Sequence, residues 1–383
     1  MRRGWGSQGA RMPVVLASAV ALTSLSSCGG LTQNDGPADD GAADNAAGAG
    51  PDSGDVDGAG GSTDGSTDGT GAGMGTGADA GMGVCTHVID GDVEAANEED
   101  LEQLVDVCSI AGSLTMEGLA VTHIQLPVLE SIGGALRIAS NDMLTAVSLP
   151  ALRSLGSALH IEENASLVSV KWPVLETVGE ESTYVLHNAS LEELSFASLR
   201  SVVDLNIQSN DSLTTLDLPG VTTGQFVVGA NQQLASLSLP ALTTSQGLSL
   251  ESNASLAAVS LPALVSTDRL RINSSSALKT LDVPALTTVA YELVVGVTSL
   301  PALSFPVLTS VGTLSVTSNA WLESISLPAL ESVGASFYVK DNNLLTEIHA
   351  PALGPVKTLI VDLNPSLVVC DGVTLNDWGA CPP

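Results

Sequence analysis

A short apolar element repeats along most of this chain and limits what the chain can fold into more than any other feature. The element reads Leu-Pro-Ala-Leu in its commonest form, and successive copies begin 21 to 24 residues apart. Eleven copies begin at Leu126, Leu149, Trp172, Phe196, Leu218, Leu239, Leu261, Val283, Phe305, Leu327 and Ala350. A period of this length is typical of a solenoid, in which each repeat buries its apolar side chains only against its neighbours.

Each apolar element is followed by a segment in which apolar and polar residues alternate. One such segment, Leu-His-Ile-Glu-Glu-Asn, ends at Asn164, and another, Leu-Ser-Val-Thr-Ser-Asn, ends at Asn319. This alternation predicts a short strand whose alternate side chains point inward. Proline lacks the N–H that a central strand needs, so the Leu-Pro step predicts a corner. The sequence therefore predicts an all-β chain, a parallel β-helix of about eleven 22-residue coils.

Asparagine ends nine of the eleven strand segments, and the exceptions are Ser275 and Val297. Asparagine adopts the left-handed backbone conformation readily and forms local hydrogen bonds in turns. Stacked coils would place these side chains above one another, so we expect an internal ladder of amides. The nine residues are Asn141, Asn164, Asn188, Asn210, Asn231, Asn253, Asn319, Asn342 and Asn364.

A short helix is predicted just before the first coil, where it would cover the open end of the stack. Asn97 is a favoured residue for the start of a helix, and the acidic residues Glu98 to Asp100 suit its positive end. Leu101, Leu104, Val105 and Cys108 then follow at the spacing of one apolar helical stripe.

The first 28 residues have the pattern of an export signal. Arg2, Arg3 and Arg11 precede an apolar run at 13–22, which is too short to cross a bilayer but fits the core of a signal peptide. The sequence Leu-Ser-Ser-Cys ending at Cys28 resembles the lipobox of bacterial lipoproteins. That resemblance implies a signal peptide at 1–27 and a lipid on Cys28. Together with the glycine that follows the cysteine, it implies anchoring at the outer membrane or cell surface.

Residues 28–83 read as a tether, and residues 84–383 as the solenoid. Between positions 29 and 83 the chain has ten Asp, no Lys or Arg, and otherwise mostly Gly, Ala, Ser and Thr. Such a segment buries too little apolar surface to offset the entropy of ordering, so disorder is predicted. A glycine-rich chain of this length has a root-mean-square reach of roughly 40 Å. The tether would hold the solenoid clear of the membrane.

The five cysteines divide into one near the amino end and two close pairs. If Cys28 carries the lipid, Cys85, Cys108, Cys370 and Cys381 remain, and an oxidising compartment favours disulfides over metal ligation for them. Three pairings are possible. Their spacing favours Cys85 with Cys108 and Cys370 with Cys381, one bond at each end of the stack.

Composition and motifs weigh against several functions. A formal net charge of −30 argues against a nucleic-acid partner and against direct adhesion to an anionic membrane. The sequence has no catalytic, cofactor or metal motif, so we expect no enzyme, no cofactor and no metal. The enzymatic alternative is a β-helix polysaccharide lyase or hydrolase, which needs acids beside Lys or Arg. Only Arg269 with Arg271 approaches such a cluster, and a purely structural role is also open.

The region from 84 to 383 resembles the receptor L domain, a leucine-rich module. The resemblance rests on a cysteine, a short helix, a second cysteine and the strand-like segment 108–116, followed by coils of the type seen at 144–152. It implies a right-handed β-helix that recognises a ligand at the cell surface, either a polysaccharide or another surface protein. Receptor L domains have about half as many coils and are followed by cysteine-rich modules, so the type of ligand does not carry over.

A binding face would consist of the outward positions of the strand segments. The most distinctive side chains there are His160, Arg271, Tyr338, Lys340 and Asp341. Exposed aromatic and cationic side chains recur at recognition surfaces. We therefore predict non-catalytic ligand recognition on this face.

Overall fold

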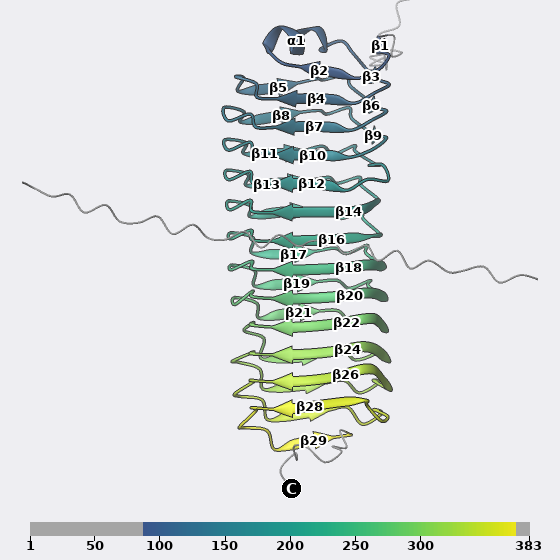
Figure 1. The fold of residues 1–383 in the computed structure, drawn as a ribbon, viewed down its shortest axis with the longest axis vertical. Helices are drawn as coiled ribbons and strands as arrows, with labels where there is room; N and C mark the ends of the chain where they lie inside the picture. Colours follow the sequence, from purple (N-terminus) through teal and green to yellow (C-terminus); the bar gives the residue numbers. More distant parts are fainter. Residues whose placement is uncertain (1–86, 373–383) are drawn as a thin grey trace, which may run out of the picture. The chain divides into compact units, whose positions relative to one another are not determined.

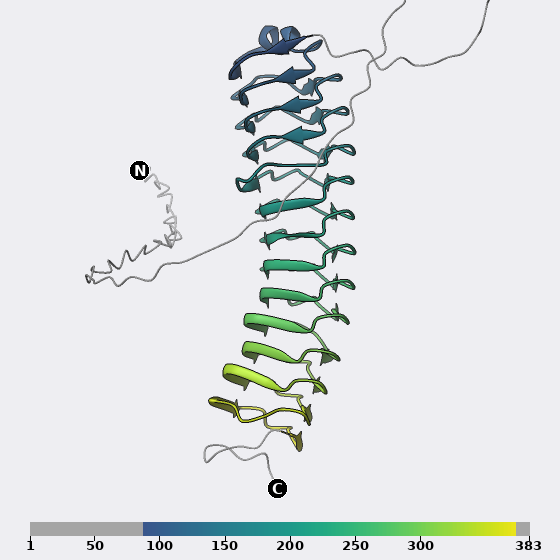
Figure 2. The same cartoon turned by 90° about the vertical axis from the view of Figure 1, so that its right-hand side faces the viewer.

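The computed structural model describes residues 87–372, and in this range the chain forms one continuous stack of β-coils (Figures 1 and 2). The paired strands run parallel, and the chain winds right-handed from coil to coil (Figure 1). The predicted all-β, right-handed parallel β-helix is confirmed.

The largest sheet contains one strand from every coil. Its thirteen strands are, in order, β2 (Val93–Ala95), β4 (Leu114–Glu117), β7 (Leu136–Ala139), β10 (Leu159–Glu162), β12 (Thr183–Leu186), β14 (Ser201–Gln208), β16 (Thr223–Gly229), β18 (Thr244–Glu251), β20 (Ser266–Asn273), β22 (Thr288–Gly296), β24 (Ser310–Thr317), β26 (Ser332–Lys340) and β28 (Thr358–Asp362). The stack thus has about thirteen coils, two more than the eleven expected. The two additional coils, those of β2 and β4, precede the first apolar element and have no asparagine at the position equivalent to Asn141. Gly118 and Leu119 stand at the turn after β4.

The other side of the stack is divided into three shorter sheets. The first contains β5 (His123–Gln125), β8 (Ala146–Ser148), β11 (Ser169–Lys171), β13 (Glu193–Ser195) and β15 (Thr215–Asp217). The second contains β17 (Ser236–Ser238), β19 (Ala258–Ser260) and β21 (Thr280–Asp282). The third contains β23 (Ala302–Ser304), β25 (Ser324–Ser326), β27 (Glu347–His349) and β29 (Val369–Asp371).

A further four-stranded sheet is confined to the early coils and contains β1 (Val88–Ile89), β3 (Ser109–Ile110), β6 (Ser131–Ile132) and β9 (Ser154–Leu155). In these coils a glycine separates the short strand from the strand of the largest sheet. A Cβ atom on Gly156 would collide with the carbonyl of Gly133 one coil earlier. From β14 to β26 the two segments form a single strand of seven to nine residues, and several of these strands change register at a bulge.

The core runs along the inside of the stack and follows the predicted alternation. In β10, Leu159 and Ile161 are fully buried, whereas His160 and Glu162 are half-exposed. The apolar elements form the predicted corners, where the Leu152 N–H donates to the Leu149 carbonyl at 3.3 Å. Few aromatic side chains are needed because each coil packs mainly leucine and valine against the next coil.

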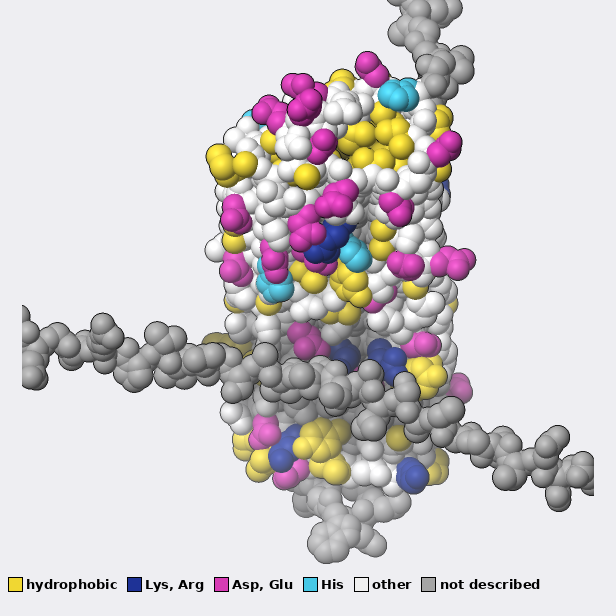
Figure 3. Space-filling model, turned by 45° about the horizontal axis from the view of Figure 1, so that its top comes forward, with side chains coloured by type: hydrophobic (Ala, Val, Ile, Leu, Met, Phe, Trp, Pro, Cys, Tyr) yellow, Lys and Arg dark blue, Asp and Glu magenta, His cyan; other side chains and the backbone are white. Residues whose placement is uncertain are grey.

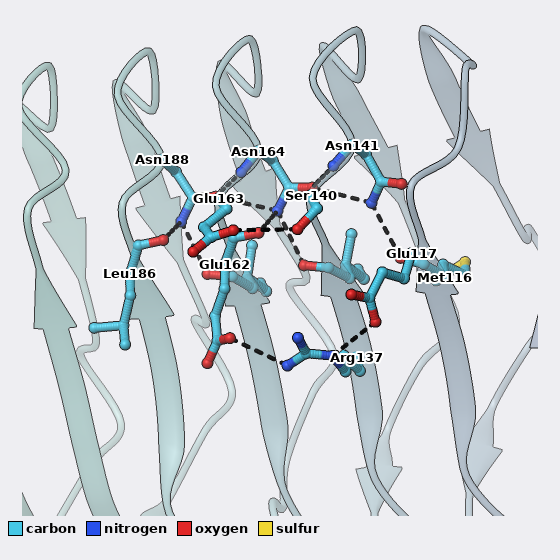
Figure 4. A network of polar contacts seen from close by, with 12 residues as sticks. Met116, Glu117, Arg137, Ser140, Asn141, Glu162, Glu163, Asn164, Leu186 and Asn188 are labelled. Atoms are coloured by element: carbon cyan, nitrogen blue, oxygen red, sulfur yellow. Dashed lines mark hydrogen bonds and ion pairs between the residues drawn. The ribbon is translucent and has the colours of Figure 1, made fainter.

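The asparagines stack as an internal ladder at the corner after the largest sheet (Figure 4). Asn164 Nδ2 donates to Asn188 Oδ1 at 3.1 Å, and Asn188 Nδ2 donates to Asn210 Oδ1 at 3.1 Å. Asn164 Nδ2 also donates to the Ile138 carbonyl, and Asn164 Oδ1 accepts the backbone N–H of Asn141. Each amide therefore satisfies backbone groups that would otherwise be buried without partners.

The left-handed turn residue is the one before each asparagine, not the asparagine itself as predicted. Ser140, Glu163 and His187 have φ of 54°, 57° and 56°, and the same holds in the later coils. The asparagine side chain must point into the coil to reach its neighbours. The chain therefore reverses at the residue before it.

The assignment of Val297 to the asparagine position was wrong by one residue. Val297 is the left-handed turn residue, with φ of 52°, and Thr298 takes the ladder position. Thr298 Oγ1 donates to Asn319 Oδ1 at 2.7 Å. The other exception, Ser275, does lie at the ladder position and is fully buried.

The predicted helix is present as α1 (Glu98–Gln103), which contacts β2 at the amino end of the stack (Figure 1). The Asn97 side chain accepts the backbone N–H of Asp100 at 3.1 Å, as expected for a helix cap. The predicted apolar stripe was wrong at Val105, which is 40% exposed, because the helix ends at Gln103. Val107 is buried in its place.

Several predictions fall on residues that lie outside the described range. These are the signal peptide at 1–27, the lipid on Cys28, the tether at 28–83, and the two cysteines Cys85 and Cys381. Within 87–372, no helix is long and apolar enough to cross a membrane.

Candidate ligand-binding face

The outward positions of the largest sheet form straight columns, and three of the predicted face residues share one of them. Strand register connects His160 on β10 through Tyr184, Asn206, Val227 and Ser249 to Arg271 on β20. The column continues through Val294 and Ser315 to Tyr338 on β26. At about 4.8 Å per coil, Arg271 lies roughly 24 Å from His160 and roughly 14 Å from Tyr338. The predicted residues therefore lie on one face without forming one pocket.

The remaining predicted residues lie beside that column. Lys340 ends β26 in a neighbouring outward column, opposite Thr317 and Asp362. Asp341 is the left-handed turn residue of its coil, with φ of 59°. His160 makes a ring contact with Tyr184 at a centroid distance of 5.1 Å.

Cations near the amino half of the stack are paired with carboxylates one coil away. Arg137 bridges Glu117 at 3.3 Å and Glu162 at 3.1 Å (Figure 4). Burial lowers the pKa of the Arg137 guanidinium, but its bonds to the two carboxylates outweigh this effect and raise the pKa overall. In the same way, Arg153 pairs with Glu176 and Lys171 with Glu193. Figure 3 shows basic and acidic side chains lying side by side on this surface.

Arg269 and Arg271 differ from the cations of the amino half, because these two arginines share a single carboxylate. The Nε atoms of Arg269 and Arg271 lie 3.8 and 3.2 Å from the same oxygen of Glu292. Arg269 also lies over the ring of Tyr291, 4.9 Å from its centroid. Tyr291 is 57% exposed, so its outer face is open to a ligand. Within the described residues these two arginines form ion pairs with Glu292 only.

A hollow adjoins the two arginines and is lined by nine residues of β16, β18 and β20, namely Gln225, Phe226, Val227, Gln246, Gly247, Leu248, Ser249, Arg269 and Arg271. Gly247, a buried residue of this lining, lies between Gln225 and Arg269. A Cβ atom on Gly247 would meet only ordinary contacts, the nearest at 3.8 Å. The backbone therefore does not require glycine here, and what glycine provides is open space beside the arginines.

Asp204 on β14 lies next to Gln225, in the outward column that continues to Gly247. Burial raises the pKa of its carboxyl group above the usual range, and a hydrogen bond from the Ser182 hydroxyl opposes the rise. Its Oδ1 atom is buried without a hydrogen-bond partner among the described residues. Asp204 is thus a carboxyl group whose ionised form the fold disfavours.

Sequence reasoning missed Trp321, Gly247 and the link through Glu292. Trp321 stands in Asn-Ala-Trp-Leu, where other coils read Asn-Ala-Ser-Leu, and this contrast was an available signal. The other two depend on coil-to-coil register, which the sequence does not give directly.

Among residues 87–372, no three His, Cys, Asp or Glu side chains gather in a way that could hold a metal ion. Cys108 and Cys370 are not free thiols in the structure. The pairing with Cys85 and Cys381 stays a prediction because those two residues lie outside the described range.

Comparison with models of known protein families gave no match, and no curated protein matches the chain.

Proposed function

We propose that this protein is a non-catalytic surface receptor for an extracellular polysaccharide that carries carboxylate groups. The observation that carries the proposal is the hollow over Gly247 beside two arginines that share one carboxylate. A guanidinium group binds carboxylates through paired hydrogen bonds. The side chains of Gln225 and Gln246 add amide donors and acceptors for sugar hydroxyls along the same hollow.

An extended ligand suits the geometry better than a small one. The hollow is open to the surface, and the outward column of Arg271 continues to Tyr338 about three coils away, roughly 14 Å, with Lys340 in the neighbouring column. A polymer lying along the stack could contact both places. The face residues His160 and Asp341 would then belong to the outer parts of the same surface.

Recognition is favoured over catalysis by the state of the carboxylate nearest the arginines. Glu292 accepts from both guanidinium groups, an arrangement that holds the arginines in position. A lyase or hydrolase would need a general base or acid free to exchange a proton with the substrate. Asp204, the other carboxyl group beside the hollow, has its unpartnered oxygen buried and so out of reach of a ligand on the surface. The enzymatic alternative and a purely structural role remain as outcomes of the test below.

The same proposal includes how the receptor is displayed. We propose an exported lipoprotein of the outer membrane or cell surface, with a signal peptide at 1–27, a lipid on Cys28 and a tether at 28–83. Disulfides Cys85–Cys108 and Cys370–Cys381 would close the two ends of a solenoid related to receptor L domains. In this arrangement the only contact with the membrane is the lipid, and no cofactor is needed.

The test exposes the full-length protein to a panel of immobilised polysaccharides. Polygalacturonate and alginate represent acidic polymers, and dextran and mannan represent neutral ones. Retention on the polymer and newly formed chain ends are measured together. We expect retention on an acidic polymer without new ends, and loss of about tenfold or more in affinity in Arg269→Gln with Arg271→Gln. One charge-assisted hydrogen bond to a ligand is worth roughly 1.5–3 kcal/mol.

Arg153→Gln serves as the matched control, because Arg153 is an equally exposed arginine in a single ion pair. New chain ends would identify an enzyme instead. Absence of both signals on every polymer would leave a protein partner or a structural role, and either result overturns the proposal.

A further inference from the structure

One coil departs from the repeat at the corner that precedes the second side of the stack. In the other coils with a ladder residue, a buried leucine follows three positions later, as Leu256 follows Asn253. In the coil of β22 this leucine, Leu300, follows Thr298 after only two positions. The turn is therefore one residue shorter than elsewhere, and it begins with the strained residue Val297, a β-branched side chain at positive φ.

At the same corner one backbone hydrogen bond to the preceding coil is displaced, because the Ser299 N–H donates to the Leu278 carbonyl at 3.0 Å. The residue after the buried leucine normally donates its N–H to the coil before it, as Lys279 does to Ala257 at 2.9 Å and Glu323 does to Pro301 at 2.8 Å. Pro301 occupies this position in the irregular coil and has no N–H to donate. The sheet on this side is interrupted here, between β21 and β23.

These departures coincide with an exposed tryptophan beside a hollow. Trp321 is 62% exposed and stands one coil after the shortened turn. The hollow next to it is lined by Lys279, Ser299, Pro301, Trp321 and Glu323. Irregularities in an otherwise consistent repeat lower stability, and they concentrate at functional sites.

We propose that this hollow is a second binding site, one that takes the ring of a neutral sugar. The indole ring of Trp321 offers a flat apolar face, and the C–H face of a pyranose ring can stack on it. Lys279 would donate to ring hydroxyls on one side, and Glu323 would accept from them on the other. The Ser299 hydroxyl already donates to the Ser276 carbonyl at 2.6 Å, so its oxygen is left to accept.

Charge separates this site from the hollow over Gly247. The hollow beside Trp321 is lined by one lysine and one glutamate, so its charged side chains sum to zero. Unlike the hollow beside the two arginines, it therefore has no excess positive charge to attract an anionic group. It also lies around the corner from the largest sheet, on the turns that precede β21, β23 and β25. The inference is therefore independent of the acidic-polymer proposal. If both hold, the stack binds a charged and an uncharged part of the same glycan or of two glycans.

The test uses tryptophan emission of the full-length protein during titration with neutral hexasaccharides of glucose, mannose and galactose. We expect a saturable blue shift with at least one of them, because stacking removes the exposed indole from water. Trp172 is fully buried and should not respond. Any response of Trp5 or Trp378, the other two tryptophans of the chain, would persist in the Trp321→Ala variant. Trp321→Ala should lose the shift and at least about tenfold in affinity by calorimetry, the range of a binding hot spot. Trp321→Phe should keep part of the affinity.

Two further variants separate the hollow from the tryptophan. Insertion of one alanine between Ser299 and Leu300 restores the common turn length and should abolish binding while Trp321 remains. Met143→Ala removes an exposed apolar side chain at the equivalent turn position of an early coil and should change nothing. Circular dichroism checks that each variant keeps its fold.

The inference is overturned if no neutral hexasaccharide shifts the emission, or if Trp321→Ala binds as tightly as the unmodified protein. If Arg269→Gln with Arg271→Gln removes the response to neutral sugar, the two hollows are not separate sites and the inference is also overturned. Failure on acidic polymers with a normal neutral-sugar response would overturn only the proposed function.

Discussion

Asp204 is a single outward side chain whose charged form is disfavoured by its surroundings. Its carboxyl group lies beside the hollow, has one buried oxygen without a partner, and has a raised pKa because burial disfavours its ionised form. Ordinary surface carboxylates on this protein, such as Asp217, accept a hydrogen bond in the open. The difference has a measurable consequence for stability.

Asp204→Asn should stabilise the protein near neutral pH. Because the folded-state pKa is raised, the folded chain binds this proton more tightly than the unfolded chain does. Stability from this group is therefore greatest below the ordinary aspartate value of about 3.9 and declines as the pH rises through the raised value. Thermal melting between pH 4 and 8 should show a higher melting temperature for the variant at pH 7, and a difference that shrinks toward pH 4. Asp217→Asn is the control, and an identical pH trend in both variants would contradict the assignment.

At the scale of elements, the asparagine ladder connects each coil to the next. Amide-to-amide bonds run from Asn141 to Asn231, and Asn253 Oδ1 extends this run by accepting the Asn231 backbone N–H. Side-chain bonds resume from Thr298 to Asn364. Ser275 lies between these two runs, and its hydroxyl contacts only the Asn273 carbonyl of its own coil, at 3.5 Å. Coupling between coils should therefore be strong within each run and weaker across Ser275.

Asn188→Ala should accordingly destabilise far more than Ser275→Ala. Removing the Asn188 amide leaves the Ile161 carbonyl and the Asn164 N–H without their partners inside the stack. Each buried group left unsatisfied costs about 1–3 kcal/mol, so we expect a loss of roughly 3 kcal/mol or more. Ser275→Ala should cost less than about 1 kcal/mol, since only one long contact is lost. Urea unfolding measures both, and equal losses would show that the ladder does not couple the coils as described.

Sequence periodicity was sufficient for the strands, corners and ladder because these depend on contacts that repeat in every coil. The left-handed turn at Ser140 and the shifted register at Val297 depend on how one side chain fits its neighbours, and the repeat does not reveal this. Arg269 and Arg271 are two residues apart in the sequence, which was enough to single them out as a pair of cations. Their common partner Glu292 lies one coil later, beyond a bulge, and only the structure gives that register.

The whole molecule combines a strongly acidic chain with a locally basic hollow. A net charge of −30 repels acidic polymers at long range, and salt near physiological strength screens this repulsion within about 8 Å. Binding of an acidic polymer must therefore rest on close contacts with Arg269 and Arg271. The long face also means that affinity should grow with polymer length until the chain spans the distance to Tyr338.

The most direct test of the account fills the hollow over Gly247 and leaves the arginines in place. Gly247→Leu adds a side chain whose Cβ meets no close contact, so the fold should be kept. Gly334→Leu is the matched control, because a Cβ there also meets only ordinary contacts, the nearest at 3.5 Å, and lies in another coil. Calorimetry with the acidic polymer that the protein retains should give about a tenfold weaker Kd for Gly247→Leu and an unchanged Kd for Gly334→Leu. An unchanged Kd for Gly247→Leu, with its melting temperature preserved, would contradict the account.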